Sequence, residues 1–477
     1  MKKVLLPVSK SLYIRKLIYD FLKYHRLDDI EAGFPEDVRI VYEGLRVIQN
    51  VEKERNTDNG VARIDVHDCG AAYRFLMALL AVTPGQWLLT GTERLLQRPI
   101  EELVQCLQSM GADIQWISDN DNVVSCRDVP WRVSDEDNVI SSRDAKFCVS
   151  TNAKQGWLIR GKNLHVSDLT IDCRRSGQFA SALWLIAEEI GLKKLHVLPE
   201  NPSSLSYIEM TKAVVNGSVK LEDGHLADWS AAVYWYARLL LEGQMQNSTR
   251  PYSSSGTAFG DAPASYKLLQ LDSSSIQSDA VIARWFTDWG IEGCQEEDGV
   301  VITYKENLIK PQEVIELDMC QNLDLVPVLA CMACLWPKKM IFNGVSNLKY
   351  KESNRLQIIQ EQLSPFAKIE IKSYNGIPDN QLVINPIYCE DMPCRVYTNN
   401  DAIPHRDAMN CVSTNDDRSN ISPRIFSFNA HNDHRFVMGF SLFALRGKVQ
   451  IKDFDCVRKS YPNFKAEGVV AGTDMVG

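Results

Sequence analysis

The chain has 477 residues, which is too long for a single ordinary hydrophobic core, so we expect two or three domains. Hydrophobic residues make up 45% of it and charged residues 24%, which is typical of a globular protein in water. The formal net charge of −9 argues against general binding to nucleic acid or anionic membranes, which need a broad basic surface, but a few converging cations could still bind a small anion.

The segment LPVSKSLYIRKLIYDFL, which begins at Leu6, predicts an amphipathic helix because its apolar residues recur at helical spacing. Ser9 or Ser11 could cap its start, where Lys10 also stands, and Ser11 and Arg15 share one face. Such a segment is either a capped surface helix with solvated cations or an anion site, since a helix N-terminus offers unpaired N–H groups and a partial positive charge.

Four segments share one plan, an amphipathic helix followed by a short break and a short strand. They begin at Pro99, Ser206, Ser278 and Glu352. Three have glycine at or near the break, where a helix end favours a left-handed residue, and the fourth has Ser-Pro. Repetition of this unit predicts an α/β protein built of similar modules.

Three polar, turn-rich segments separate these modules, and we interpret them as loops or strand connections. They begin at Ser118, Gln246 and Thr398. They could also be insertions at the surface, because turn residues outnumber apolar ones in each.

The cysteines and histidines give little evidence for a metal. Cys331 and Cys334 form a C-x-x-C inside an apolar run with no second pair, so we interpret both as buried packing residues. His431 and His434 could share a helix face, which is weak evidence for a metal. The thirteen cysteines are scattered and no export signal precedes them, which predicts reduced thiols in a cytoplasm.

Several cations stand at helix starts or in short connections. Arg74 follows Gly70 at the start of an apolar helix, and glycine there permits close approach of a ligand to the backbone. Arg98 precedes Pro99, a residue typical of the first helical position. One such cation alone is usually a solvated surface residue, but convergence of these helix ends would form a polyanion pocket.

Eight motifs, in order from Leu6 to Phe464, resemble those of the 5-enolpyruvylshikimate-3-phosphate (EPSP) synthase family. The first four are LPVSKSLYIR, DCGAAYR, LTGTERLLQRPIEELVQCLQSMGADI and RRSGQFASALWLIA. The last four are DWSAAVYW, NLKYKESNRL, NDHRFVMGFSLFAL and CVRKSYPNF. Each motif alone is weak evidence, but their common order argues strongly against coincidence.

The resemblance implies an α/β, two-domain enolpyruvyl transferase fold with three βαβαββ-type repeats in each domain and the active site in the interdomain cleft. The inner domain, on the shikimate 3-phosphate side, would span residues 10–227. The second domain would combine residues 1–9 with 228–477, so that the chain crosses between domains twice. The resemblance also implies a cytoplasmic monomer that binds two small-molecule substrates but no nucleic acid, membrane, metal or cofactor.

The implied reaction transfers the enolpyruvyl group of phosphoenolpyruvate to the 5-hydroxyl of shikimate 3-phosphate and releases phosphate, a step of aromatic amino acid biosynthesis. It runs by addition and elimination through a tetrahedral intermediate, so the site needs fixed cations and acid–base groups. The family's catalytic residues match Lys10, Asp324, Glu352 and Lys459. Asp324 would take the 5-hydroxyl proton, and Glu352 or Lys459 would serve the methylene carbon. By position alone, Asp324 and Glu352 could instead be helix-start acids stabilised by the helix dipole.

The substrate ligands also carry over by resemblance. The phosphoenolpyruvate ligands match Lys10, Gly70, Arg98, Gln178, Arg355, Arg435 and Lys459. The shikimate 3-phosphate ligands match Lys10, Ser11, Arg15, Ser176, Gly177, Gln178, Ser204, Tyr207, Asp324, Asn347 and Lys351. Arginine suits both anions because its guanidinium binds carboxylate and phosphate in a bidentate manner.

The sequence departs from the family pattern at several positions. Val8 replaces a glycine, and because a β-branched residue rarely adopts positive φ, the backbone there must be ordinary or the helix start altered. Gly177 replaces a serine whose hydroxyl would bind phosphate. The other departures are Asp68 for Asn, Ala71 for Thr, Phe75 for a frequent Pro and Asn354 for Asp. We therefore expect an active enzyme with weaker or altered binding of shikimate 3-phosphate.

Two other functions stay open. A UDP-N-acetylglucosamine enolpyruvyl transferase shares the fold and the phosphoenolpyruvate chemistry, but the S-K-S, K-E-x-x-R and D-H-R segments favour the first choice. A non-catalytic relative that binds an anionic metabolite would explain the departures. Retention of all four catalytic matches argues against it.

Overall fold

The computed structural model describes residues 1–31, 33–53, 61–118, 126–127, 155–200, 202–219, 227–247, 265–310, 312–387, 425–467 and 473–475. The chain divides into two compact units, each with its own hydrophobic core. The N-terminal unit comprises residues 8–226, and the C-terminal unit combines residues 1–7 with 227–477. Most of the polar segments that begin at Gln246 and Thr398 lies outside the described residues.

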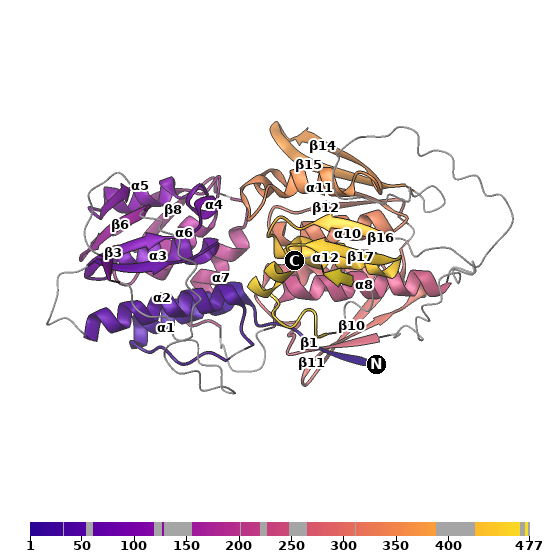
Figure 1. Cartoon of the computed structure of the whole chain (residues 1–477), viewed down its shortest axis with the longest axis horizontal. Coiled ribbons are helices and arrows are strands. Elements are labelled where there is room, and N and C mark those ends of the chain that lie inside the picture. Colours follow the sequence, from indigo (N-terminus) through magenta and orange to yellow (C-terminus); the bar gives the residue numbers. More distant parts are fainter. Residues whose placement is uncertain are drawn as a thin grey trace. The chain divides into compact units, whose positions relative to one another are not determined.

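The N-terminal unit contains a five-stranded sheet of order β4-β6-β3-β2-β5 and a parallel pair β7-β8 (Figure 1). Its strands are β2 (Val61–Asp65), β3 (Gly85–Thr90), β4 (Asp113–Ile117), β5 (Cys126–Arg127), β6 (Gly156–Gly161), β7 (Asp168–Asp172) and β8 (Lys194–Leu198). Its helices are α1 (Lys10–Tyr24), α2 (Glu36–Lys53), α3 (Gly70–Val82), α4 (Glu93–Leu96), α5 (Glu101–Ser109), α6 (Gln178–Leu185) and α7 (Leu205–Val215). Strand β5 lies in the polar segment that begins at Ser118, so part of that segment is a strand paired with β2 rather than a loop.

The C-terminal unit contains three sheets, of order β1-β9-β11-β10, β12-β13-β15-β14 and β16-β17-β18. The strands of the first two sheets are β1 (Lys2–Leu5), β9 (Ser265–Leu269), β10 (Ile291–Glu296), β11 (Gly299–Tyr304), β12 (Val314–Asp318), β13 (Lys339–Asn343), β14 (Ala367–Tyr374) and β15 (Ile377–Pro386). The third sheet holds β16 (Ile425–Asn429), β17 (Lys448–Lys452) and β18 (Thr473–Met475). The α-helices are α8 (Trp229–Asn247), α9 (Ile282–Asp288), α10 (Val326–Leu335), α11 (Arg355–Leu363) and α12 (His434–Ser441). Short 3-10 turns connect them: η1 (Ser278–Val281), η2 (Glu306–Leu308), η3 (Leu323–Leu325), η4 (Ser346–Tyr350), η6 (Leu442–Leu445) and η7 (Phe454–Lys459).

One supersecondary unit, βαβαββ, recurs in both parts of the molecule. In each copy the first two strands are parallel, and the last two are antiparallel neighbours that extend the sheet. Among the described residues it occurs complete as β2-α3-β3-α5-β4-β6, as β12-α10-β13-α11-β14-β15 and as β1-α8-β9-α9-β10-β11. The whole N-terminal unit is inserted between β1 and α8 in the last copy. The predicted α/β modules are therefore confirmed.

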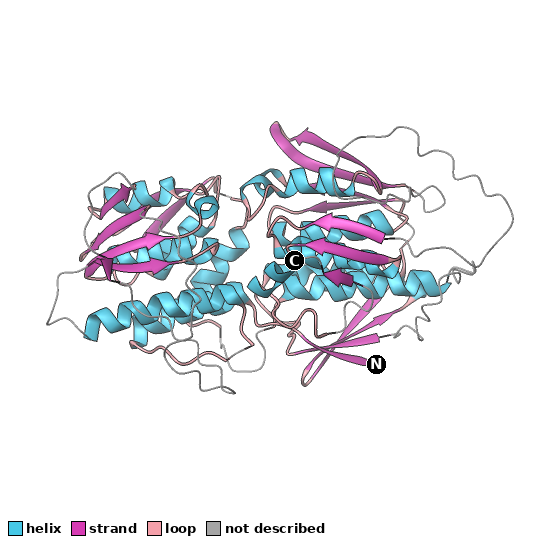
Figure 2. Cartoon of the chain, in the orientation of Figure 1, coloured by secondary structure: helices cyan, strands magenta, loops and turns pink. Residues whose placement is uncertain are grey.

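The predicted breaks between helix and strand are also confirmed. Helix α5 leads into β4, α9 into β10 and α11 into β14, as Figure 2 lets the reader follow by secondary structure. Gly111, Gly217 and Gly290 adopt φ of +96°, +65° and +102°, a conformation that favours glycine because it has no Cβ. Helix α7 forms as predicted, whereas the strand expected after it falls largely on residues 220–226, outside the described part of the chain.

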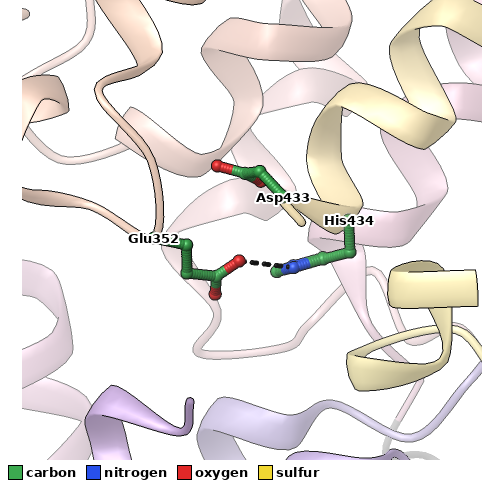
Figure 3. A group of neighbouring side chains, drawn as sticks. All are labelled: Glu352, Asp433 and His434. Carbon is green, nitrogen blue, oxygen red and sulfur yellow. Dashed lines mark ion pairs between the residues drawn. The ribbon is translucent and has the colours of Figure 1, made fainter. Parts of the chain in front are cut away.

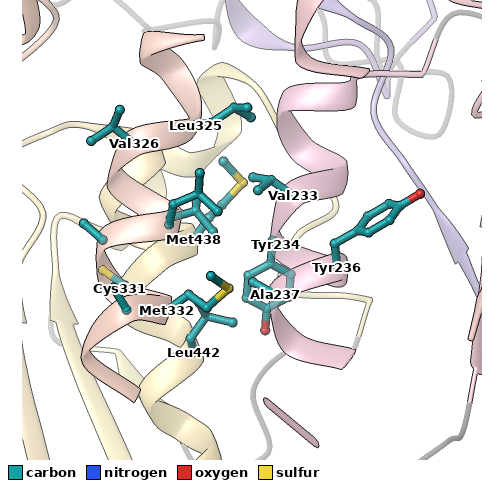
Figure 4. Packing of buried hydrophobic residues seen from close by; sticks show 14 of the residues in the cluster. Val233, Tyr234, Tyr236, Ala237, Leu325, Val326, Cys331, Met332, Met438 and Leu442 are labelled. Atoms are coloured by element: carbon teal, nitrogen blue, oxygen red, sulfur yellow. The ribbon is translucent and has the colours of Figure 1, made fainter. Parts of the chain in front are cut away.

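The core of the C-terminal unit is built around α8, α10 and α12. Figure 4 shows side chains of α8 and α10 interleaved with Met438 of α12 and with Leu442, which follows it. Because every residue of α10 is buried, this helix is apolar on all sides, as a helix enclosed by protein must be. Cys331 and Cys334 are free thiols inside it, so their predicted packing role is confirmed. No helix among the described residues is both long and apolar enough to cross a membrane.

Helix α1 forms as the sequence predicts, but its start differs in one respect. Leu17, Ile18 and Phe21 are buried along its apolar face. Ser9 occupies the N-cap position, yet its hydroxyl makes no capping hydrogen bond. The predicted cap is thus wrong at the level of the side chain. Val8 is not among the residues with positive φ, so the backbone before the helix is ordinary.

Candidate active site

In the N-terminal unit, two guanidinium groups gather at the start of α3. A Cβ added to Gly70 would stand 2.5 Å from Arg98 Nη1 and 2.9 Å from Arg74 Nη1. Arg74 donates to the Gly70 carbonyl at 3.1 Å, to the Pro99 carbonyl at 2.9 Å and to Gln178 Oε1 at 2.8 Å. A side chain at position 70 would therefore have to displace these guanidinium groups. Three of the predicted phosphoenolpyruvate ligands therefore surround one helix N-terminus.

Lys10 approaches the same helix end. Its Nζ lies 2.9 Å from Asp37 Oδ2 in the first turn of α2. Cys69, the N-cap residue of α3, lies within the electrostatic influence of both groups. Burial raises the pKa of the Cys69 thiol, Asp37 raises it further and Lys10 lowers it. The partly buried Lys10–Asp37 pair thus holds an ammonium group within electrostatic reach of the N-cap residue of α3.

Arg15 forms a second cationic position, closed in by polar oxygens and aromatic rings. Its guanidinium donates to Thr211 Oγ1 at 2.6 Å, to the Ser11 carbonyl at 2.6 Å and to the Tyr207 carbonyl at 3.3 Å. It also lies over the rings of Phe75, at 5.1 Å, and of Tyr207, at 5.8 Å. Phe75, a departure from the family pattern, therefore supports a predicted substrate ligand.

Arg15 and Arg74 share an unusual electrostatic state. Both are almost fully buried, with 2% and 1% of their surface exposed. Burial lowers the pKa of Arg15 to about 10, and burial together with the nearby Arg98 lowers that of Arg74 to about 9. Among the residues that the structure describes, neither guanidinium contacts a carboxylate. No contacting carboxylate among those residues therefore balances their positive charge.

The starts of α6 and α7 lie next to Arg15 and Arg74. Ser176 Oγ accepts a hydrogen bond from the Gln178 backbone at 3.3 Å, and Gly177 is the N-cap residue of α6. A Cβ on Gly177 would meet the carbonyl oxygens of Ser203 and Ser204 at 3.2 Å each. Ser204 holds the N-cap position of α7, with φ of +69°. This close approach of two helix starts accounts for the glycine in place of serine.

In the C-terminal unit, Arg355 lies between two carboxylates. Its Nη1 lies 2.8 Å from Asp324 Oδ1, and its Nε lies 2.8 Å from Asp433 Oδ2. Lys351 Nζ adds a second cation 3.2 Å from Asp324 Oδ1. Burial alone would raise the pKa of Asp324, but Lys351, Arg355 and Arg435 hold it well below its usual range. Asp324 is therefore an ionised carboxylate in this state.

Glu352 pairs with His434, and Figure 3 shows this pair next to Asp433, the carboxylate that Arg355 contacts. The distance from His434 Nδ1 to Glu352 Oε2 is 2.7 Å, which makes an ion pair when the imidazole is protonated. Asp433 completes a group whose ligand atoms lie within 4.8 Å of one another, as in a metal site. However, Asp433 accepts hydrogen bonds from Arg355, from Ser353 and from the Arg435 backbone, which occupies its carboxylate. We interpret the group as an acid–base pair, Glu352 with His434, next to a structural carboxylate, and assign no metal.

The remaining predicted residues of this unit flank these carboxylates. Arg435, at the start of α12, lies 3.8 Å from Asp228, and Asp228 and Asp324 raise its pKa although burial opposes the change. Lys459 Nζ donates to the Asn432 carbonyl at 3.2 Å, just before the D-H-R segment. Asn347 lies in η4, directly before the loop of Lys351.

The histidine prediction is wrong. Helix α12 begins at His434, and His431 lies in the turn before it with φ of +50°, so the two do not share a helix face.

The structure adds five residues to the predicted ligands, of which the sequence indicated Arg74 only as a cation at a helix start and His434 only as weak evidence for a metal. Each touches a predicted ligand; they are Asp37, Arg74, Asp228, Asp433 and His434. All but Asp37 stand inside one of the quoted motifs, which is the signal that could have found them. Asp37 carries no local signal, because its partner Lys10 is 27 residues away.

Two departures also gain a structural role. Asn354 caps α11 by accepting a hydrogen bond from the Gln357 backbone at 3.3 Å. Asp68 accepts one from the hydroxyl of Thr92.

Two units of βαβαββ modules, each with buried arginines at helix starts, define an α/β protein suited to anionic substrates. A family model described as EPSP synthase (3-phosphoshikimate 1-carboxyvinyltransferase) matches residues 37–149 and 267–467. The chain belongs to the EPSP synthase family, so the predicted family is confirmed.

Similar proteins agree with this assignment. A 3-phosphoshikimate 1-carboxyvinyltransferase of Dehalococcoides mccartyi is 24% identical over 484 residues, covering 97% of this chain and 94% of its own. One of Syntrophobacter fumaroxidans is 25% identical over 400 residues, covering 83% of this chain and 76% of its own. A 2.37 Å structure of EPSP synthase from Acinetobacter baumannii matches with a TM-score of 0.55 at 16% identity, covering 99% of this chain and 95% of its own. The last comparison confirms the predicted two-domain fold class.

Proposed function

We propose that this chain transfers the enolpyruvyl group of phosphoenolpyruvate to the 5-hydroxyl of shikimate 3-phosphate and releases phosphate. The observation that carries this proposal is the buried, unbalanced charge of Arg15 and Arg74 in a member of the EPSP synthase family. A buried cation without a counter-ion is costly, and an anionic substrate supplies the missing partner. The buried positive charges of Arg15 and Arg74 are therefore suited to the anionic substrates of the family's reaction.

Cations at helix starts would bind phosphoenolpyruvate. In the N-terminal unit these are Lys10 and Arg98, with Gly70 giving access to the backbone and Gln178 held in place by Arg74. In the C-terminal unit they are Arg355, Arg435 and Lys459. The guanidinium groups suit carboxylate and phosphate because they offer parallel N–H donors in a fixed plane.

The second substrate would bind through shorter polar side chains around one buried cation. Arg15 would take the phosphate of shikimate 3-phosphate, with Ser11, Ser176, Gly177, Ser204 and Tyr207 around it. Asn347 and Lys351 would contact the same substrate from the C-terminal unit. At Gly177 only a backbone N–H can donate, so we expect weaker binding than in relatives with serine there.

Proton transfer would use the carboxylates of the C-terminal unit. Asp324 accepts the proton of the 5-hydroxyl as its oxygen bonds to C2 of phosphoenolpyruvate, and Glu352 or Lys459 delivers a proton to C3, which gives a tetrahedral ketal phosphate. Loss of a proton from C3 then expels phosphate and restores the double bond. The Glu352–His434 pair suits this step, because an imidazole at ion-pair distance can accept a proton from the Glu352 carboxyl and return it. We further propose a cytoplasmic monomer that needs no metal or organic cofactor and binds neither nucleic acid nor membranes.

Phosphate release from phosphoenolpyruvate tests the function. We expect release with shikimate 3-phosphate, together with an enolpyruvyl ether detected by mass spectrometry, and none with UDP-N-acetylglucosamine. Release with the nucleotide sugar alone would identify the other enolpyruvyl transferase. A folded protein, shown by circular dichroism and cooperative unfolding, that releases phosphate with neither acceptor would contradict both enzymatic functions.

A further inference from the structure

A buried carboxylate outside the proposed machinery stands close to Asp324. Asp279 lies in η1 of the C-terminal unit and is 2% exposed. Its Oδ1 accepts a hydrogen bond from Asn322 Nδ2 at 2.9 Å, and its Oδ2 accepts one from the hydroxyl of Ser230. Both donors are neutral, so this carboxylate is satisfied without an ion pair at hydrogen-bond distance among the described residues.

Asp279 is the last of three consecutive residues whose side chains connect two distant segments. Gln277 accepts from the Trp229 backbone at 3.1 Å and donates to the Ala227 carbonyl at 2.8 Å, which ties it to the start of α8. Ser278 donates to the Gln321 carbonyl at 3.2 Å. The segment 277–279 therefore joins the start of α8 to the turn at 321–322.

That turn carries Asp324. Asn322 is the N-cap residue of η3, two positions before Asp324 along the chain. Lys351 and Arg355 hold the Asp324 side chain, while Asn322 ties the backbone of its turn to Asp279. The position of the Asp324 carboxylate thus depends on both sets of contacts.

Asp279 also interacts electrostatically with the Asp324 carboxylate. Burial raises the pKa of Asp279 to about 6, although the hydrogen bonds from Asn322 and Ser230 lower it. Asp324 on η3 raises it further, and Arg435 on α12 lowers it. Arg435 interacts electrostatically with both Asp279 and Asp324, and also with Asp228 at the start of α8. A charge on Asp279 therefore makes Asp324 a stronger base and helps to balance Arg435.

We infer that Asp279 is a positioning residue for Asp324, which it holds in place through the turn at Asn322. The inference rests on the proposed function, in which Asp324 accepts the 5-hydroxyl proton. Asp279 itself touches no reacting atom in this scheme. Its role is to set the orientation of the Asp324 carboxylate.

Two matched substitutions separate positioning from general support. Asn322→Ala and Ser230→Ala each remove one neutral hydrogen bond from Asp279, the first toward Asp324 and the second toward α8. For Asn322→Ala we expect kcat to fall about tenfold with KM changed less, because small misplacement of a base is costly. For Ser230→Ala we expect about a twofold change at most. An equal loss of kcat in the two variants would overturn the inference.

Asp279→Asn removes the charge and keeps the size. We expect it to lower kcat at least as much as Asn322→Ala and to flatten the fall of kcat below about pH 6. Asp272→Asn, in a surface turn where Ser274 donates to the aspartate, is the matched control and should leave the profile unchanged. A profile for Asp279→Asn that keeps the full acidic limb would contradict the role assigned to its charge.

A double-mutant cycle measured by urea unfolding tests the coupling between Asp279 and Asp324 without any enzymatic turnover. Urea unfolding of Asp279→Asn, Asp324→Asn and the double variant should be non-additive, with coupling of at least threefold in the folding equilibrium constant. Asp272→Asn should add independently to Asp324→Asn. Absence of turnover in the unsubstituted protein would contradict the proposed function alone. Additive unfolding of Asp279→Asn with Asp324→Asn would overturn the link between the two carboxylates whether or not the protein is active.

Discussion

The buried arginines of the two units are balanced in opposite ways. In the N-terminal unit, Arg15 and Arg74 donate hydrogen bonds to neutral oxygens and contact no carboxylate among the described residues, and their pKa values are lowered. In the C-terminal unit, Arg355 lies between Asp324 and Asp433, and its pKa is raised. The first arrangement leaves a positive charge for a ligand to neutralise, whereas the second is already neutralised by the protein.

This difference separates two tasks. A buried cation without a neighbouring carboxylate favours an incoming anion, because folding has removed the water around the cation and the anion supplies a partner for its charge. A carboxylate held by arginine stays ionised and fixed in place, as a base must be. We therefore expect changes in the N-terminal group to alter mainly KM and changes in the C-terminal carboxylates to alter mainly kcat.

The largest expected effect is the loss of the proposed base. Asp324→Asn should lower kcat about 10²- to 10⁴-fold with a smaller change in KM, because an amide cannot accept the 5-hydroxyl proton. Steady-state phosphate release at saturating substrates measures it. Asp318→Asn, at the exposed end of β12, is the control and should keep full activity. A large rise in KM with unchanged kcat would assign Asp324 to binding instead.

Stability distinguishes the balanced arginine from the unbalanced one. Arg355→Met leaves the buried Asp433 carboxylate without its ion pair, while Lys351 still contacts Asp324, and it should lower the free energy of unfolding by about 3–5 kcal/mol. Arg15→Met leaves no buried charge behind and should cost about 1 kcal/mol. Urea denaturation of both variants measures the contrast. Equal losses would show that Arg15 is balanced by the protein after all.

The free energy of unfolding should depend on pH through Asp279 in the C-terminal unit. Because Asp279 binds its proton more tightly in the folded chain than in the unfolded chain, its contribution to stability falls as pH rises from about 4 to about 6. The loss should be on the order of 2–3 kcal/mol relative to Asp279→Asn. Unfolding free energies of the two proteins between pH 4 and 7 measure it. Parallel curves would contradict the raised pKa.

A smaller effect, on the KM for phosphoenolpyruvate, is expected when a side chain is added at Gly70, the first residue of α3. Gly70→Ala places a Cβ against Arg98 and Arg74 and should raise the KM for phosphoenolpyruvate about tenfold while the KM for shikimate 3-phosphate stays unchanged. Gly33→Ala is the control, because a Cβ there meets no atom within 4 Å. An equal rise in both KM values would point to general disruption of the unit.

The smallest effect concerns the missing hydroxyl. Gly177→Ser should lower the KM for shikimate 3-phosphate by about two- to fivefold relative to Gly177→Ala. Both variants press the same Cβ on the Ser203 and Ser204 carbonyls, so their ratio isolates the hydroxyl. A ratio of one would remove the hydroxyl as the cause of weaker binding.

Local patterns in the sequence were sufficient for the secondary structure and the modules. The apolar face of α1, the repeated helix-to-strand units and the buried Cys331 and Cys334 all follow from periodicity, which acts over a few residues. The ordered motifs were sufficient for the family. Features that depend on backbone angles at a helix start escaped this reasoning, including the unused hydroxyl of Ser9 and the turn at His431.

The order of the amino acids is enough to assign which residues carry charge and which helices they begin. How each charge is balanced follows from the folded arrangement. Arg15 meets Thr211 across 196 positions, and Arg355 meets Asp433 across 78. Nothing near these residues in the chain distinguishes an arginine with a carboxylate from one without. The state of a buried charge is set by the groups that folding brings within a few ångströms of it, because water no longer screens it there.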